Sequence, residues 1–475
     1  MTALFDPARR RRLLGWAVML GTGGLILAIP LPEGIDPSAW RLLAIFAMTI
    51  VGSIVQPIPA GAIVLIAVCA TALTGALTPT QALGGYADPV VWMVLCAFFL
   101  SHGIIRTGLG RRFAFLFIRA IGKSTVGLAY ALAGTDCILA SIIPSNAARA
   151  GGVLFPITLS LAEAYESRPG PTAGRLGKYL MTAVYQCDVV NSAMFLTGQA
   201  SNVIAAKFAL DAAGYQLSYA GWILGAIVPG LIALLVLPPF LARVLRPEVR
   251  HTPDAAKFAA EELARLGPLS WNERITLVVF LLVAGLWMTA TLHHINYAVV
   301  ALMGVGILVV TGVLDWIELV SDGAAWNIFI WYGGLVRMAE ALGESGITRR
   351  FAEAAAGLTA GWAWGAALAG LLLIYFYAHY GFASITAHVA AMFTPFLVVI
   401  LAAGTPPALA VLSLAYFSNL CAALTHYGTT PAPIYFGANY VTQREWWLTG
   451  WLISLVTIAI FVVFGFTWWK VLGWW

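Results

Sequence analysis

The chain has 475 residues, of which 61% are hydrophobic and only 10% are charged, and its formal net charge is +5. So little charge over this length excludes an ordinary soluble protein and is typical of an all-α polytopic membrane protein. The basic residues gather in loops, so they indicate topology in the membrane rather than nucleic-acid binding. The five cysteines stand singly in apolar segments without metal or redox spacing, and we expect packing residues, no metal and no cofactor.

A basic cluster at 9–12 precedes the first apolar run. By the positive-inside rule the N-terminus is cytoplasmic, in a multi-pass protein of the cell (inner) membrane. Apolar runs of span length follow at about 13–29, 40–55, 60–77 and 90–105. The last of these ends in basic residues between 106 and 123, which again fits the cytoplasmic side.

Residues 124–162 form two apolar arms around a polar break. Pro144 interrupts the helix, so a helix that restarts at Ser145 and Asn146 points free N–H groups and its positive dipole end forward. This arrangement suits an anion, although a plain serine cap is the simpler interpretation. The arms either cross the membrane twice or form a re-entrant hairpin. We prefer the hairpin, because it keeps the tip buried in protein at mid-depth.

The rest of the chain alternates apolar runs with polar interruptions. A fifth span is broken by the polar stretch 191–202, and a linker at 243–274 carries a short amphipathic helix and divides the chain into halves. The other apolar regions lie at about 222–241, 275–292, 295–313, 325–342, 362–402, 408–440 and 446–469. The region 408–440 is interrupted again, near 425–433. In total we expect about eleven transmembrane helices.

The two halves repeat one another. Ser145 and Ser384 are 239 residues apart, as are Arg149 and His388, so each half places a hydroxyl one helical turn before a basic group. The string RRFA recurs at 111–114 and 349–352 with an offset of 238. An odd number of crossings between the copies makes the repeat inverted, which is the pattern of secondary transporters with interrupted helices.

Four segments resemble the divalent anion–sodium symporter (DASS) superfamily, and the resemblance covers essentially the whole chain. They are PSNAARAGGVLFPI (144–157), NSAMFLTGQASN (191–202), FASITAH (382–388) and THYGTTPAPIYFG (425–437). The subgroup that the chain resembles most contains the bacterial citrate/succinate and tartrate/succinate antiporters and the plastid 2-oxoglutarate/malate translocator.

The resemblance implies a homodimer with eleven spans per protomer. Each protomer would have scaffold helices and a transport part that carries two opposed re-entrant hairpins and moves as an elevator. On this basis the chain divides into N-terminal scaffold helices (1–89), a first transport repeat (90–215, hairpin 124–162), further scaffold helices with the linker (216–324), a second transport repeat (325–445, hairpin 362–402) and a last span (446–475).

The family pattern at each hairpin tip is Ser-Asn-Thr, and here each tip lacks one polar member: Ser145-Asn146-Ala147 and Ser384-Ile385-Thr386. The resemblance implies substrate contacts at Ser145, Asn146, Ser384, Thr386, Thr430 and Pro431. Ser141 and Gly198 are possible remnants of a cation site, and a packing role is as good an interpretation of Gly198.

We therefore expect exchange of di- or tricarboxylates of the succinate, malate and 2-oxoglutarate class without sodium. Fixed positive charge at Arg149 and His388 would compensate the substrate's charge, and the empty carrier would then return poorly. Alternatives are that Arg149 pairs with a structural carboxylate and His388 is neutral packing, or that the carrier is a sodium- or proton-coupled symporter. No enzyme constellation is present in the sequence, and Asp136 and Asp188 stand isolated in apolar stretches.

Overall fold

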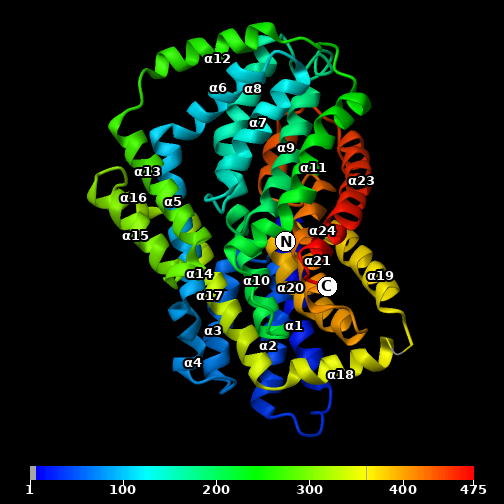
Figure 1. The fold of residues 1–475 in the computed structure, drawn as a ribbon. Helices are drawn as coiled ribbons and strands as arrows, with labels where there is room; N and C mark the ends of the chain where they lie inside the picture. Colours follow the sequence, from blue (N-terminus) through cyan, green and yellow to red (C-terminus); the bar gives the residue numbers. More distant parts are fainter. Residues whose placement is uncertain (1–6, 360) are drawn as a thin grey trace, which may run out of the picture.

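The computed structural model describes residues 7–359 and 361–475, and the regular elements of this part of the chain are helices (Figure 1). Its one β pairing within those residues is an isolated bridge between Ser124 and His251. The all-α expectation is thus confirmed.

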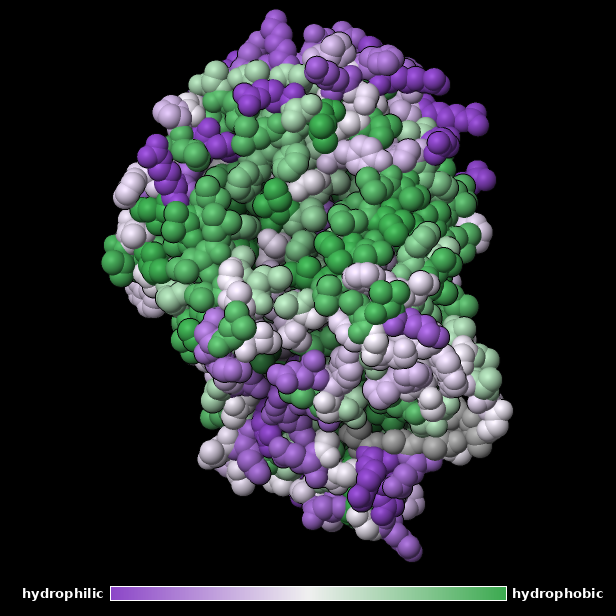
Figure 2. Space-filling model, viewed as in Figure 1, coloured by the Kyte–Doolittle hydropathy of each residue, from purple (hydrophilic) through white to green (hydrophobic). Residues whose placement is uncertain are grey.

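Six helices of the described chain are long and apolar enough, by length and composition, to cross a membrane. They are α2 (Pro37–Val55), α5 (Pro89–Thr107), α11 (Tyr219–Leu245), α13 (Trp271–Met288), α20 (Ile385–Ala402) and the run Gln443–Val471, which comprises α23 (Gln443–Ile460), η7 (Phe461–Gly465) and α24 (Phe466–Val471). Shorter apolar segments are Arg12–Ala28 within α1 (Pro7–Ala28), α3 (Ala60–Leu73), α7 (Thr125–Ala140), α15 (Tyr297–Val310) and Pro407–Ala423, which comprises α21 (Pro407–Leu420) and η6 (Cys421–Ala423). Figure 2 shows a broad hydrophobic region across this face and hydrophilic residues at both ends, the distribution that a bilayer requires.

The predicted breaks in two helices are present. The first lies between α9 (Gly177–Met194) and α10 (Ala200–Ala213), joined by the short turn η4 (Leu196–Gly198). The Asn202 side-chain amide donates to the carbonyls of Ser192 and Phe195, at 2.8 Å each, and so satisfies backbone groups that the break frees. The second break follows α21, where η6 (Cys421–Ala423) and a loop lead to α22 (Pro431–Gly437).

Two further turns lie where the sequence predicts hairpin tips. Helix α7 ends at Ala140, and the chain restarts as the π-helix η3 (Ala147–Leu154), which continues into α8 (Phe155–Ala164). In the second half, α19 (Trp364–Tyr377) and η5 (Ala378–Gly381) lead to α20, which begins directly after Ser384. Because π-helical segments are rare and concentrate at functional sites, η3 marks the first tip as unusual.

Two amphipathic helices were not predicted. The basic residues between 106 and 123 predict the cytoplasmic edge of a span, but residues 109–121 form the helix α6 (Leu109–Ile121). Its counterpart α18 (Ile347–Thr359) has both ends 238 residues further along the chain. Each carries the RRFA string, and the two lie at opposite ends of the molecule in Figure 1. The amphipathic helix expected in the linker is α12 (Pro253–Leu266), at the same end as α6.

A buried ion pair fixes α6. The Arg112 guanidinium contacts the Glu273 carboxylate at 2.7 and 3.1 Å and donates to the Gly267 carbonyl at 2.9 Å. Glu273 is itself part of a capping box with Ser270 at the start of α13. The pair therefore joins α6 to α13.

The remaining elements of the described chain are α4 (Pro79–Leu83), η2 (Gly84–Ala87), α14 (Ala290–His293), α16 (Trp316–Ser321) and α17 (Gly323–Glu344).

Candidate functional site

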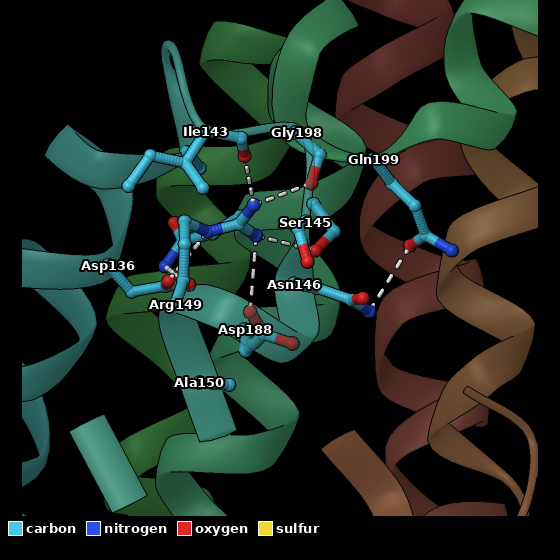
Figure 3. Close-up of polar contacts among 12 residues, drawn as sticks. Asp136, Ile143, Ser145, Asn146, Arg149, Ala150, Asp188, Gly198 and Gln199 are labelled. Carbon is cyan, nitrogen blue, oxygen red and sulfur yellow. Dashed lines mark hydrogen bonds and ion pairs between the residues drawn. The ribbon is translucent and has the colours of Figure 1, made fainter. Parts of the chain in front are cut away.

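The guanidinium of Arg149 lies inside the protein between two carboxylates. Its side chain has no exposed surface, Nε is 2.9 Å from Asp136 Oδ1 on α7, and Nη2 is 3.1 Å from Asp188 Oδ1 on α9 (Figure 3). The same Nη2 donates to the Ser192 hydroxyl at 2.8 Å. Since a buried charge is costly unless it is paired and hydrogen-bonded, these contacts explain how an arginine is accommodated here.

Two backbone carbonyls accept hydrogen bonds from the remaining nitrogen of this guanidinium, Nη1. Nη1 donates to the carbonyls of Ile143 and Gly198, at 2.6 Å each (Figure 3). A Cβ atom at Gly198 would lie 2.5 Å from the Ser192 carbonyl oxygen, so η4 cannot keep this course with a side chain at that position. The guanidinium thus lies between the first tip and η4 and joins them through the Ile143 and Gly198 carbonyls, while its other three acceptors are on α7 and α9.

The first tip has the cap that the sequence predicts. Ser145 is half-buried, and its hydroxyl accepts from the backbone N–H of Ala148 at 3.1 Å. Asn146 is buried, and its amide donates to the Thr429 hydroxyl at 2.8 Å and lies 3.4 Å from Gln199 Oε1. The first tip is therefore attached to the loop before α22.

The second tip is attached to the same loop. Ser384 caps α20 by accepting from the Ala387 N–H at 3.5 Å, and both Ser384 and Thr386 are half-buried. Just before this tip, His379 Nε2 bonds the Gly428 carbonyl at 3.0 Å. Asn146 and His379 thus contact consecutive residues of one loop, which brings the two tips together.

The two residues predicted in this loop follow directly after the one that contacts the first tip. Thr430 is exposed at the N-cap of α22 and Pro431 is the buried first residue of that helix, whereas Thr429 contacts the first tip. The sequence offered two adjacent threonines, and only the path of the loop distinguishes them.

The expected uncompensated charge at Arg149 is wrong, because Asp136 and Asp188 pair with the guanidinium and are not isolated. A signal for this was present, since an ionisable group in an apolar span requires a partner and Asp136 lies in the same predicted hairpin as Arg149. His388 is completely buried, and its Nδ1 lies 3.1 Å from His379 Nδ1 and 3.5 Å from Cys421 Sγ.

The two possible remnants of a cation site are engaged within the protein. The Ser141 hydroxyl donates to the Ile138 carbonyl at 2.7 Å, and the Ser141 carbonyl accepts from Thr197 at 2.8 Å. The Gly198 carbonyl faces Arg149. The Arg149 guanidinium therefore lies beside the Gly198 carbonyl, which the sequence suggests as a remnant of a cation site.

Two acceptors beside this cluster have no hydrogen-bond partner among the described residues. Asn191 donates through its amide to Asp136 Oδ2 at 3.0 Å, but its own Oδ1 is unpaired, as is Asp188 Oδ2. Buried unpaired acceptors are uncommon and attract a proton or a cation.

Comparison with known proteins gives one family and several relatives over nearly the full chain. A family model described as "Sodium:sulfate symporter transmembrane region" matches residues 11–475. The chain is 43% identical over 465 residues to the "Putative malate transporter YflS" of Bacillus subtilis (strain 168), covering 98% of this chain and 97% of that protein. It is 42% identical over 459 residues to the "Dicarboxylate transporter 1, chloroplastic" of Arabidopsis thaliana, covering 96% and 82%. The solved YdaH transporter of Alcanivorax borkumensis has a TM-score of 0.55 over 98% of both chains at 13% identity, which is a likeness of fold.

Proposed function

The chain belongs to the sodium:sulfate symporter family, the divalent anion–sodium symporter superfamily that its motifs resemble, and from this premise we propose that it exchanges dicarboxylates across the membrane. Its relatives are transporters and not enzymes. The substrates we propose are C4–C5 dicarboxylates such as succinate, malate or 2-oxoglutarate, with tricarboxylates also within the class. Relatives named for malate and for dicarboxylates support this choice.

The observation that carries the proposal is the attachment of both tips to one loop, through Asn146 and His379. Two helix N-termini with hydroxyl and amide groups then offer donors to the two carboxylates of one small anion. The residues proposed to contact it are Ser145, Asn146, Ser384, Thr386, Thr430 and Pro431.

We infer that Arg149 acts in place of a bound sodium ion at the first tip. Its guanidinium joins Ile143, Gly198 and α9, and these contacts need no bound ion to form the tip. His388, at the matching position of the second repeat, is proposed for the corresponding role. An empty carrier leaves helix N-termini and donors unpaired in a low dielectric, so only the loaded carrier crosses easily and transport is exchange.

The second candidate is coupled symport. The unpaired Asp188 Oδ2 favours it, since a buried carboxylate oxygen can take up a proton or a sodium ion. Under this alternative, uptake would depend on a gradient of the coupled ion rather than on internal substrate.

We propose the architecture that the family resemblance implies, with eleven spans, two re-entrant hairpins and an inverted repeat. The equal lengths and opposite placement of α6 and α18 support the inversion, and the turns at 141–146 and 378–384 support the hairpins. The scaffold parts (1–89, 216–324) would form a homodimer, and the transport repeats (90–215, 325–445) would move together as an elevator. Bacterial relatives support an inner-membrane location, with the N-terminus in the cytoplasm.

The test is uptake of labelled succinate, malate and 2-oxoglutarate into proteoliposomes, with or without internal dicarboxylate, in sodium or in choline buffer. We expect uptake only with internal dicarboxylate, at the same rate in both buffers. Uptake that requires external sodium or a proton gradient and ignores internal substrate would support the symport alternative. No uptake of any di- or tricarboxylate, by protein that is folded and inserted, would contradict both.

A further inference from the structure

Three side chains with metal-binding atoms converge behind the second tip. His379 on η5, His388 on α20 and Cys421 on η6 are all completely buried, and one ligand atom from each lies within 4.8 Å of the other two. The sequence predicts packing roles for the cysteines, because each stands singly without metal spacing. The fold brings them to one point.

Two of the three separations between ligand atoms are close to those of a tetrahedral site, and the third is no more than 4.8 Å. The two histidine Nδ1 atoms are 3.1 Å apart, and Cys421 Sγ is 3.5 Å from His388 Nδ1. A tetrahedral zinc ion with bonds of about 2.0–2.1 Å to nitrogen and about 2.3 Å to sulfur separates its ligands by roughly 3.3 Å (N to N) and 3.6 Å (N to S). A small adjustment of either imidazole would therefore admit the ion.

The surroundings leave His379 ready to bind a metal, whereas His388 must change tautomer: its Nδ1–H faces the His379 lone pair at 3.1 Å, and this proton moves to His388 Nε2, which is unpaired in the described chain, when an ion binds. His379 Nε2 bonds the Gly428 carbonyl at 3.0 Å, which places its proton on Nε2 and leaves a lone pair on Nδ1. A ligand histidine whose other ring nitrogen donates to a carbonyl is the usual support for a metal site. The His388 ring lies against Tyr375 and Phe382, with ring centroids 4.4 and 5.0 Å away, so both its orientation and the exclusion of water are set by aromatic packing.

We propose that His379, His388 and Cys421 bind a borderline-soft divalent cation of the zinc class. Nitrogen and sulfur donors select such an ion over sodium or magnesium, which prefer oxygen. On binding, the Cys421 thiol, which now donates to the Ser418 carbonyl at 3.1 Å, loses its proton to solvent and becomes a thiolate ligand.

The bound ion would fasten three separate segments. It would join η5 and α20, on the two sides of the second tip, to η6 at the break after α21. The site shares His379 and His388 with the proposed function, but it would stabilise the second tip whether or not the protein carries a carboxylate, so zinc binding measured without any carboxylate tests it separately.

The test measures zinc and cobalt binding to the full-length protein purified in detergent. We expect about one zinc ion per protomer by elemental analysis, and a higher Tm when Zn²⁺ is returned to chelator-treated protein. Co²⁺ in the same site should give the near-ultraviolet absorption of a cobalt–thiolate bond.

Cys421→Ser and His379→Ala should weaken zinc binding more than about 100-fold, since loss of an outer-shell partner alone costs 10–100-fold. Cys421→Ser should also lose the cobalt–thiolate absorption. Cys187→Ala is the matched control, because it removes another completely buried thiol and should leave the zinc content and absorption unchanged. Gel filtration and the metal-free Tm establish that each variant is folded. Folded wild-type protein that binds no zinc, or Cys421→Ser protein that binds it equally well, would overturn the proposal.

Discussion

Replacing Arg149 by methionine removes the one cation between two buried carboxylates. Methionine fills a similar volume, but Asp136 and Asp188 lose their ion pairs, and the acceptors on Ser192, Ile143 and Gly198 lose their donor. Removing one partner of a buried ion pair costs about 3–5 kcal/mol, because the remaining charge is left unpaired. We expect Arg149→Met to lower the free energy of unfolding by about this amount, and to release the first tip.

The measurements are thermal unfolding in detergent, with and without dicarboxylate, and exchange in proteoliposomes. Arg149→Met should lower the Tm, abolish the dicarboxylate-dependent rise in Tm and abolish exchange. Arg112→Met is the matched control, because Arg112 has a buried ion pair with Glu273 but contacts neither tip. It should lose stability and keep the dicarboxylate-dependent rise.

Adding Asp136→Asn to Arg149→Met should recover part of the lost stability, with a coupling of roughly 0.5–3 kcal/mol. If Arg149→Met keeps normal exchange and a normal dicarboxylate-dependent rise in Tm, the guanidinium does not hold the first tip and the reasoning is wrong.

Three further variants, one of them a double substitution, test the two tips and their supports. Asn146→Ala combined with Ser384→Ala should lower exchange at least several-fold in protein that still reaches the membrane, since each lost hydrogen bond to a buried carboxylate is worth about 1–3 kcal/mol; unchanged exchange would place the site elsewhere. Thr429→Val removes the acceptor for the Asn146 amide and should reduce exchange without changing the amount of folded protein, and wild-type rates would show that Asn146 needs no such partner. Gly198→Ala forces a Cβ to within 2.5 Å of the Ser192 carbonyl and should abolish exchange, whereas Gly152→Ala, where a Cβ meets open space, should not; equal rates in the two variants would contradict the role given to η4.

Sequence patterns predicted the parts of the fold that depend on local chemistry. The break at Pro144, the cap at Ser145 and the interruption at 191–202 follow from a missing donor, a hydroxyl acceptor and polar residues in an apolar run, and all three are present. The amphipathic helix of the linker was found for the same reason. Helix α6 was missed because its basic residues also fit the cytoplasmic edge of a span.

Contacts between distant residues could not be predicted in the same way. Arg149 and Asp188 are 39 positions apart, and Asn146 and Thr429 are 283 apart, so no local period relates them. The convergence of His388 on α20 with Cys421 on η6 likewise depends on how α20 packs against α21 and the turn after it, which no local sequence pattern predicts. A buried arginine requires an ionic partner, but the sequence contains several carboxylates that could pair with Arg149 and does not say which of them do.

The pairing of Arg149 also bears on how the chain enters the membrane during synthesis. An arginine or aspartate at the centre of a helix inserted by the translocon costs about 2.5–3.5 kcal/mol. Asp136 and Arg149 are 13 residues apart on the two sides of one turn, so they leave the ribosome together and can enter as a pair with no net charge. Asp188 follows 39 residues after Arg149, on α9. The segment from α7 to α8 can therefore be inserted before α9 has been synthesised, and the arrival of Asp188 then completes the site in a second, later step.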